Sequence, residues 1–519
     1  MIQNREKIHR YIYLFGLTSL GIMLCWSVFL MSATQFLLLG NWILEGNFKQ
    51  KISILKKRKS ILVFTGIILV HFLWLFNTNN IQYALHDIQI KIPLLILPII
   101  IGTSKLLTKK ELNIILIFFV ASIFFASLFS IAIYLGFTKF EYVGYRSLSV
   151  FVSHIRFSLM LVMAMVISGY FALKNNNIQF KILYFSLALW FLFFVFFLQS
   201  ITGVIVVIFI LFIGSFNLLF LFKNVWIKTV LLISILLLVY IIFNWGKQSI
   251  NKFYYVNKTD DITKLDKFTI NNNIYLNDTS NNITENGNLV TIYISNYELK
   301  KEWNKRSSLF FDSLDNKGNL IKYTLYRYLA SKNLRKDSVG ISKLTDNDIK
   351  NIENGMPNYL FENKISPYII LYKLLSEYET YKNTQNINNK STLQRVEYFR
   401  TGVQIFNNNL FLGIGTGDVQ DKFNEYYNKN NSTLTEENRH RAHNQILTFL
   451  ITFGLFGFLI ILFAFIYPLF YETNKNNILL SYFLMIIILS FLNEDTLETQ
   501  AGVTFAGFFY MLFVFGYKK

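Results

Sequence analysis

The sequence predicts an all-α membrane protein that crosses the bilayer about twelve times and carries one large, mostly helical hydrophilic insert. Hydrophobic residues make up 53% of the 519 residues and charged residues only 16%, which is too much apolar surface for a soluble globule of this size. The apolar residues gather in runs such as 111–137, 180–222 and 443–471. Each run is close to or longer than the roughly 20 residues that a helix needs to span the hydrocarbon core. Such runs are expected to be helical, because a helix satisfies its own backbone hydrogen bonds inside the bilayer.

Hydropathy along the chain predicts three parts. Residues 1–246 hold about nine spans, 247–441 form a hydrophilic loop domain, and 442–519 hold about three more spans. The fourth span contains Pro93 and Pro98 and is therefore expected to kink. The predicted spans are 11–26, 27–45, 60–77, 83–101, 111–137, 150–173, 180–198, 202–222, 225–245, 443–471, 477–492 and 500–516.

Basic residues favour one side of the predicted membrane. The opposite short connections contain Lys139, Arg146 and an acidic patch at 494–498. The positive-inside rule therefore predicts cytoplasmic termini and a periplasmic loop domain, in the inner membrane of a bacterium. This placement accounts for the net charge of +19 without a nucleic-acid partner. The basic residues on the predicted cytoplasmic side are Lys49, Lys51, Lys56, Lys57, Arg58, Lys59, Lys105, Lys109, Lys110, Lys174, Lys181, Lys223, Lys228, Lys475, Lys518 and Lys519.

A predicted amphipathic helix in the loop domain is the first candidate for chemistry. Its charged end carries Arg395 and Arg400. A guanidinium is always charged and donates in a fixed fork, so it suits a pyrophosphate group at the depth of the lipid headgroups. The alternative is an arginine that is merely solvated. The apolar positions recur at helical spacing and would let the helix rest on the membrane surface; they are Val396, Phe399, Val403 and Phe406.

Two histidines stand at the ends of predicted spans. His443 directly precedes a long apolar run, at the boundary where a lipid-bound donor would meet a polar acceptor. Because imidazole takes up a proton near neutral pH, His443 is the candidate general base; the alternative is a hydrogen bond at a helix start. His154 and Arg156 enter another span at its periplasmic end. Ionisable groups are costly there unless they face a polar cavity, and simple snorkelling to the interface is the alternative.

Three other patterns are given structural interpretations. Asp346 and Asp348 follow Thr345 and are expected to start a capped helix rather than to bind a metal. The glycines at 413–417 have no strand and helix around them to form a nucleotide site, and we expect a tight turn that brings the chain close to the membrane. The acidic patch at 494–498 is expected to be a solvated loop. The alternative is that its carboxylates hold a neighbouring arginine in place. No metal or other cofactor is expected.

The order of these motifs resembles the bacterial O-antigen ligases and the related O-antigen polymerases. The resemblance rests on the helix at Arg395, the turn at 413–418, and Ala442-His443-Asn444, which leads into Phe453-Gly454-Leu455-Phe456-Gly457. The predicted topology, with a large loop before the last spans, agrees in outline. The loop is also similar to that of the Bacteroidetes members of the family, through the segment Thr324-Leu325-Tyr326-Arg327-Tyr328-Leu329 and the later Arg335-Lys336-Asp337.

The resemblance implies a metal-independent, inverting glycosyltransferase that moves a glycan from undecaprenyl pyrophosphate to an acceptor such as the lipid A core. Arg395 and His443 match residues that are essential in the family. A family arginine that follows a serine between two central spans is replaced here by Ile201, and Arg156 is the candidate to supply its charge. The candidate substrate-binding residues are Arg156, Arg400, His154, Arg327 and Arg335.

Other activities fit the same residues. An O-antigen polymerase and an oligosaccharyltransferase that acts on protein hydroxyls differ from a ligase only in the acceptor. A non-catalytic transporter of lipid-linked sugars is the alternative of another class. Such a transporter is expected to carry several charged residues inside its central spans and to need no histidine in the loop, and the sequence shows few such charges.

Overall fold

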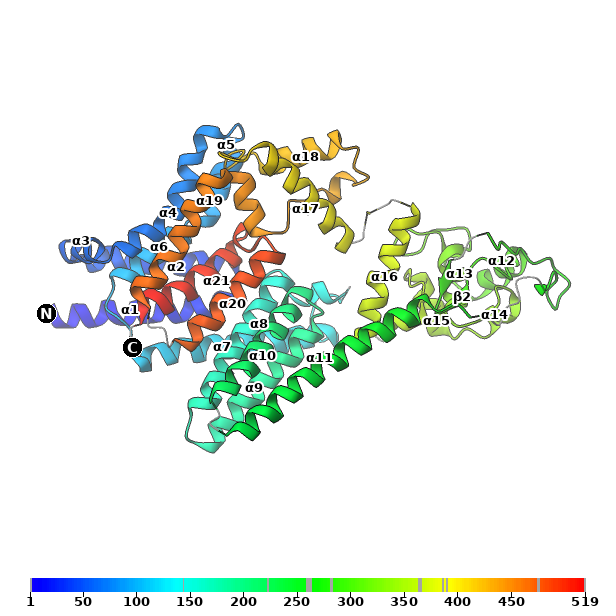
Figure 1. Ribbon diagram of the computed structural model, residues 1–519, viewed down its shortest axis with the longest axis horizontal. Coiled ribbons are helices and arrows are strands. Elements are labelled where there is room, and N and C mark those ends of the chain that lie inside the picture. The colour runs from blue at the N-terminus through cyan, green and yellow to red at the C-terminus, as the bar shows by residue number, and fades with distance from the viewer. Residues whose placement is uncertain are drawn as a thin grey trace. The chain divides into compact units, whose positions relative to one another are not determined.

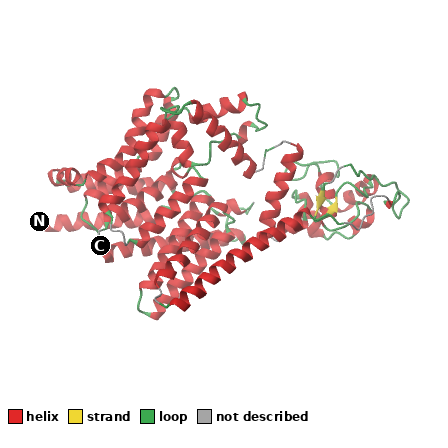
Figure 2. Cartoon of the chain, viewed as in Figure 1, coloured by secondary structure: helices red, strands yellow, loops and turns green. Residues whose placement is uncertain are grey.

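The computed structural model describes residues 2–142, 144–221, 224–257, 264–280, 283–362, 366–384, 387–388, 391–473 and 477–517. Helices dominate these residues (Figure 2). The predicted all-α membrane fold is therefore confirmed. Four of the basic residues used to predict the orientation lie outside the described residues, namely Lys223, Lys475, Lys518 and Lys519.

Each apolar run predicted as a span overlaps a helix. In the described part of the chain, eight helical segments are long and apolar enough to cross a membrane, and three shorter apolar helices accompany them. The chain is therefore a multi-pass membrane protein. The helices that overlap the predicted spans are α1 (Ile2–Met23), α2 (Val28–Glu45), α4 (Lys59–Leu73), α5 (Ile81–Lys91), α6 (Pro93–Thr103), α7 (Lys109–Tyr134), α8 (His154–Lys174), α9 (Ile178–Phe197), α10 (Ile201–Leu221), α11 (Val225–Tyr254), α19 (Gln445–Glu472), α20 (Ile478–Asn493) and α21 (Gln500–Met511).

The predicted kink in the fourth span is present as a break between two helices. Helix α5 ends at Lys91 and α6 begins at Pro93. Proline has no N–H to donate, so it interrupts a helix from within but is well tolerated at a first helical position. Pro93 therefore sets the point at which the helical hydrogen bonding of this segment is interrupted.

The chain packs into two compact units. Unit 1 consists of Met1–Leu221 and Asn386–Lys519, and unit 2 of Phe222–Gln385. These units are defined by packing, whereas the predicted parts 1–246, 247–441 and 442–519 follow the expected side of the membrane. The membrane-side boundaries therefore remain a prediction.

Two enclosed helices form the centre of unit 1 (Figure 1). Helix α8 is buried along almost its whole length and packs against α7, α9, α10 and α20. Residues 501–516, which include most of α21, are buried in the same way. Both helices are covered along most of their length, and the residues at their N-terminal ends, such as His154 and Gln500, are half-buried.

A break in α19 anchors the glycine turn. Gly454 has a φ of 62° and interrupts the helical ladder, which leaves the carbonyls of Ile451 and Thr452 without helical donors. The N–H groups of Ile414 and Gly415 donate to these carbonyls at 3.0 and 2.9 Å. A side chain at Gly415 would collide with the carbonyl of Asn77. The glycines thus allow a close approach to neighbouring helix ends, which is a different contact from the predicted approach to the membrane.

The anchored turn connects two helices that lie outside the predicted spans. Helix α17 (Ser391–Asn408) precedes it and α18 (Val419–Lys429) follows it. Helix α17 packs on α19, where a Cβ on Gly402 would lie only 2.9 Å from Leu447. This close contact and the turn together fix α17, with Arg395, against the start of α19.

Unit 2 contains a small core of its own. Trp303, Leu325 and Ile352 are fully buried in it, and helix α11 packs against α16. Thr345 and Asp348 form the predicted capping box at the start of α15, so that interpretation is confirmed. The elements are α12 (Asn296–Arg306), α13 (Ile321–Ser331), α14 (Ser338–Ser342), α15 (Asp346–Glu353), α16 (Pro367–Thr384) and an antiparallel pair of short strands, β1 (Thr284–Glu285) and β2 (Asn288–Leu289).

Candidate active site

A pocket of about 650 Å³ in unit 1 collects residues from five separate segments. These are the start of α8 with the residues before it, the start of α10 with the residues before it, helix α17, the residues before α19 and the end of α20. Three of the predicted site residues, His154, Arg395 and His443, line it together. The remaining lining residues are Tyr145, Arg146, Ile155, Leu198, Gln199, Ile201, Thr202, Thr392, Val396, Phe399, Ala442, Asn444, Leu492 and Asn493.

One buried carboxylate, Glu494, joins the candidate catalytic residues. Its Oε1 accepts a hydrogen bond from Nη2 of Arg395. Its Oε2 lies 3.5 Å from Nδ1 of His443 and 3.4 Å from Nη1 of Arg156. Glu494 is 1% exposed. Burial by itself would raise the pKa of this carboxyl, but the contact with His443 and the charges of the two arginines outweigh it and lower the pKa.

His443 is held at the start of α19 by its backbone. The side chain of Asn444 caps the helix by accepting from the N–H of Leu447, so the predicted position at a helix start is confirmed. His443 itself has a φ of 48°, a left-handed conformation that few residues other than glycine adopt. Its N–H donates to Oδ2 of Asp495 at 3.2 Å, and its ring lies 5.6 Å from that of Tyr398. These contacts fix the direction of the imidazole.

Arg395 is oriented by the end of α20. Its Nη1 lies 3.3 Å from both the carbonyl and the side-chain oxygen of Asn493, while Nη2 is bound to Glu494. The side chain keeps 32% of its surface exposed. A planar guanidinium that is held along one edge has donors left for a ligand on the open side.

The acidic patch at 494–498 is buried, so the expectation of a solvated loop was wrong. Glu494, Asp495 and the side chain of Glu498 are all largely enclosed. Glu498 is paired with Lys91 at 2.9 Å and with Arg441 at 3.3 Å. The alternative interpretation, that the patch holds arginines in place, is the one observed. Glu494 and Glu498 tolerate burial because they have cationic partners from distant parts of the chain. Asp495 instead accepts hydrogen bonds from the N–H of His443 and the hydroxyl of Thr448.

Arg156 turns away from this pocket. Its Nη2 donates to the carbonyl of Asp495 at 2.6 Å, and the residue lines a second pocket instead. Arg146, which sequence reasoning used only for topology, is exposed and lines the first pocket together with Ile201. The sequence did contain an indication that Arg146 lies near the candidate site, since Arg146 shortly precedes His154 in the same connection. Nothing in the local sequence indicates that this connection and the start of α10 line the same pocket.

The other predicted arginines lie elsewhere. Arg400 is exposed on α17 and does not line the pocket. Arg327 and Arg335 belong to unit 2. Arg327 is paired with the buried Glu285 at 2.5 Å. Arg335 is paired with Asp266 at 2.6 Å and lies over the ring of Tyr293. The latter two arginines thus have partners within unit 2, and their role towards a substrate remains a prediction.

Comparison with known proteins identifies the segment that carries this site. Residues 365–462 match the family model described as O-antigen ligase. The matched segment contains Arg395, the glycine turn, His443 and the first part of α19. No curated protein matches the chain. The chain is therefore a multi-pass helical membrane protein that carries an O-antigen ligase family domain at residues 365–462.

Proposed function

We propose that this protein is an inverting glycosyltransferase that moves a glycan from undecaprenyl pyrophosphate to an acceptor hydroxyl, with the lipid A core as the acceptor. We place the reaction at the periplasmic face of the inner membrane, with both termini in the cytoplasm. The observation that carries the proposal is that one buried carboxylate, Glu494, contacts both His443 and Arg395 beside a pocket. The segment that matches the O-antigen ligase family contains His443 and Arg395.

His443 is proposed to act as the general base. Nδ1 of His443 lies 3.5 Å from Oε2 of Glu494. In the tautomer that carries its proton on Nδ1, beside this carboxylate, the lone pair of Nε2 is the one left to receive a proton. The acceptor oxygen attacks the anomeric carbon while His443 takes the hydroxyl proton. The bond from that carbon to the pyrophosphate oxygen breaks on the opposite face, which inverts the configuration and releases undecaprenyl pyrophosphate. Glu494 stabilises the imidazolium that forms, as a third group does in other nucleophile and base pairs.

Arginines are proposed to stabilise the leaving group. Negative charge develops on the pyrophosphate as the glycosidic bond breaks, and donors already in place offset this charge in the transition state. Arg395 has donors available on its open side. Arg146 lines the same pocket beside Ile201 and, in this proposal, supplies the charge that Ile201 cannot. Arg156 acts through Glu494, which it contacts directly.

Apolar residues beside the pocket suit the polyprenyl chain. Val396 and Phe399 of α17 are 63% and 48% exposed, and they belong to the face predicted to rest on the membrane. Ile201 of α10 is also exposed and lines the same pocket. A lipid tail lying along these side chains would hold the reacting carbon at a constant depth, which favours attack through proximity and orientation.

Transfer is expected to persist in excess EDTA, because the proposed chemistry needs no divalent cation. The measurement is transfer of a labelled glycan from a synthetic undecaprenyl pyrophosphate donor by the purified protein in lipid vesicles, with and without the chelator. Among the described residues, no group of three or more His, Cys, Asp or Glu side chains is arranged to hold a metal. Transfer that EDTA abolishes and Mg²⁺ or Mn²⁺ restores would refute this mechanism.

A further inference from the structure

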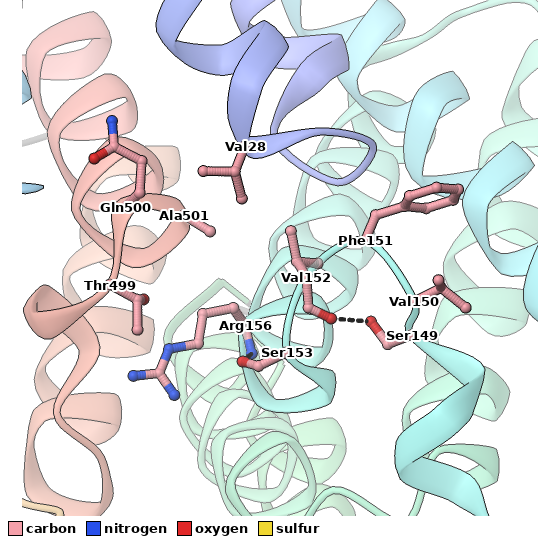
Figure 3. A pocket seen from close by; sticks show the side chains of 10 residues that line it. All are labelled: Val28, Ser149, Val150, Phe151, Val152, Ser153, Arg156, Thr499, Gln500 and Ala501. Carbon is pink, nitrogen blue, oxygen red and sulfur yellow. Dashed lines mark hydrogen bonds between the residues drawn. The ribbon is translucent and has the colours of Figure 1, made fainter. Parts of the chain in front are cut away.

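A second pocket, of about 490 Å³, lies on the other side of Arg156 in unit 1 (Figure 3). It is bounded by Val28 at the start of α2, by residues 149–153 before α8, and by residues 499–501 at the start of α21. Figure 3 shows the Arg156 side chain extending from α8 towards Thr499. None of the residues that line the first pocket also lines this one, so the two pockets are distinct sites.

Three helices begin at this pocket. The first residues of α2, α8 and α21 are Val28, His154 and Gln500. The side chain that caps each helix accepts from the N–H of its third residue only, through Ser27, Ser153 and Thr499. The N–H groups of a first helical turn have no acceptor within their own helix and carry partial positive charge. Residues from the N-terminal ends of all three helices, among them Val28, Ser153 and Thr499, line the pocket. The partial positive charge of these ends attracts an oxyanion.

Arg156 adds a full positive charge to the same place. The residue is only 8% exposed, and its Nε–H has no hydrogen-bond partner among the described residues. A buried donor without a partner is costly, which favours a ligand that supplies an acceptor. The charge of Arg156 is only partly neutralised, because its partner Glu494 is shared with Arg395.

The rim of the pocket is apolar. Val28, Val150 and Phe151 are 42%, 39% and 37% exposed, and each lines the pocket. An inorganic ion makes no use of such a rim, whereas the acyl chains of a lipid would cover it. Positive charge at the base and apolar side chains at the rim together match an amphiphile with an anionic head.

We propose that this second pocket binds the phosphate group of an anionic lipid. The phosphate oxygens would accept hydrogen bonds from the N-terminal turns of α2 and α21 and from Nε of Arg156, while the acyl chains would lie against Val28 and Phe151. The site is separate from the pocket that holds His443, and the proposal does not depend on glycan transfer.

The test compares two acidic substitutions in the first turn of α2. Val28→Glu places a negative charge at the pocket, whereas Leu30→Glu places one outside it at a position of nearly equal exposure, 42% against 41%. Both are compatible with the helix, since acidic residues are favourable in a first turn. Binding of dihexanoyl phosphatidic acid to the purified full-length protein is measured by native mass spectrometry. We expect Val28→Glu to weaken one bound lipid by at least about tenfold and Leu30→Glu to leave it unchanged.

Two further probes identify the ligand chemistry. Dihexanoylglycerol, which has the same acyl chains without phosphate, should not occupy the site, and inorganic phosphate should bind far more weakly than phosphatidic acid. Equal binding of dihexanoylglycerol would overturn the role of the phosphate, and inorganic phosphate that binds as well as the lipid would overturn the role of the acyl chains. Equal losses in the two glutamate variants, with melting temperatures unchanged, would overturn the location.

Discussion

Replacing His443 with asparagine is expected to slow glycan transfer by about 10² to 10⁴-fold, the usual contribution of a general base, while the lipid-linked donor still binds. Asparagine suits this position because it tolerates the left-handed backbone, with a φ of 48°, and retains the N–H that donates to Asp495. It cannot accept a proton near neutral pH. The rate of a single turnover and the dissociation constant of the donor are measured separately.

His440→Asn is the matched control for that substitution. His440 is exposed, lies 6.1 Å from the ring of His443 and does not line the pocket, so its variant should transfer at nearly the normal rate. If His443→Asn transferred glycan as fast as the unmodified protein, proton transfer by this histidine would be excluded. Loss of donor binding in the same variant would instead indicate a positioning role for His443.

Arg395→Ala is expected to reduce the rate of transfer by about 30-fold to 1000-fold, which corresponds to roughly 2 to 4 kcal/mol of lost transition-state stabilisation. Arg395→Lys should recover only part of this loss. A lysine keeps the charge but cannot contact Glu494 and Asn493 with two separate nitrogens while donating to a phosphate. The measurement is again a single-turnover rate at equal protein abundance in the membrane.

The control for the Arg395 variants is Arg400→Ala, on the same helix. Arg400 is exposed and outside the pocket lining, so a clearly smaller loss is expected there. Glu494 keeps Arg156 and His443 as neighbours when Arg395 is removed, which limits the damage to the fold. Equal losses at the two positions would show that the general charge of α17, rather than the fork of Arg395, is what matters.

Features that depend on local sequence could be predicted. Runs of apolar residues gave the helices, Pro93 marked the break before α6, and Thr345 with Asp348 gave a capping box. The start of α19 beside His443 was visible in the same way. In each case the physical cause, whether hydropathy, a missing N–H or a side-chain cap, acts within a few residues, so one stretch of sequence contains it.

Features that depend on distant partners could not be predicted. The sequence around Glu494 is polar and therefore predicted a solvated loop. The burial of Glu494 is explained only by its contacts with Arg156 and Arg395, which are 338 and 99 residues away in the sequence. Likewise, the sequence does not indicate that Arg146 lines the first pocket and Arg156 the second. Hydropathy and periodicity carry no information about such pairings.

The glycine turn at 413–417 is a second example of a contact that could not be predicted. The sequence predicted a tight turn, but it did not indicate which segment the turn would contact. The turn lies against the broken part of α19 because Gly454 leaves the carbonyls of Ile451 and Thr452 open. A helix break and the segment that completes its hydrogen bonds are about forty residues apart in the chain, and only the folded structure brings them together.

The central claim, that the pocket between α17 and α19 carries out glycan transfer, is tested most directly by counting both products in one reaction. Purified protein in lipid vesicles is given a donor labelled separately on the glycan and on the undecaprenyl chain, together with lipid A core. We expect one free undecaprenyl pyrophosphate to appear for each glycan joined to the acceptor, and we expect His443→Asn to stop both. Donor that moves across the bilayer with its glycan still attached, and with no free undecaprenyl pyrophosphate, would exclude glycan transfer in this pocket and indicate a transporter.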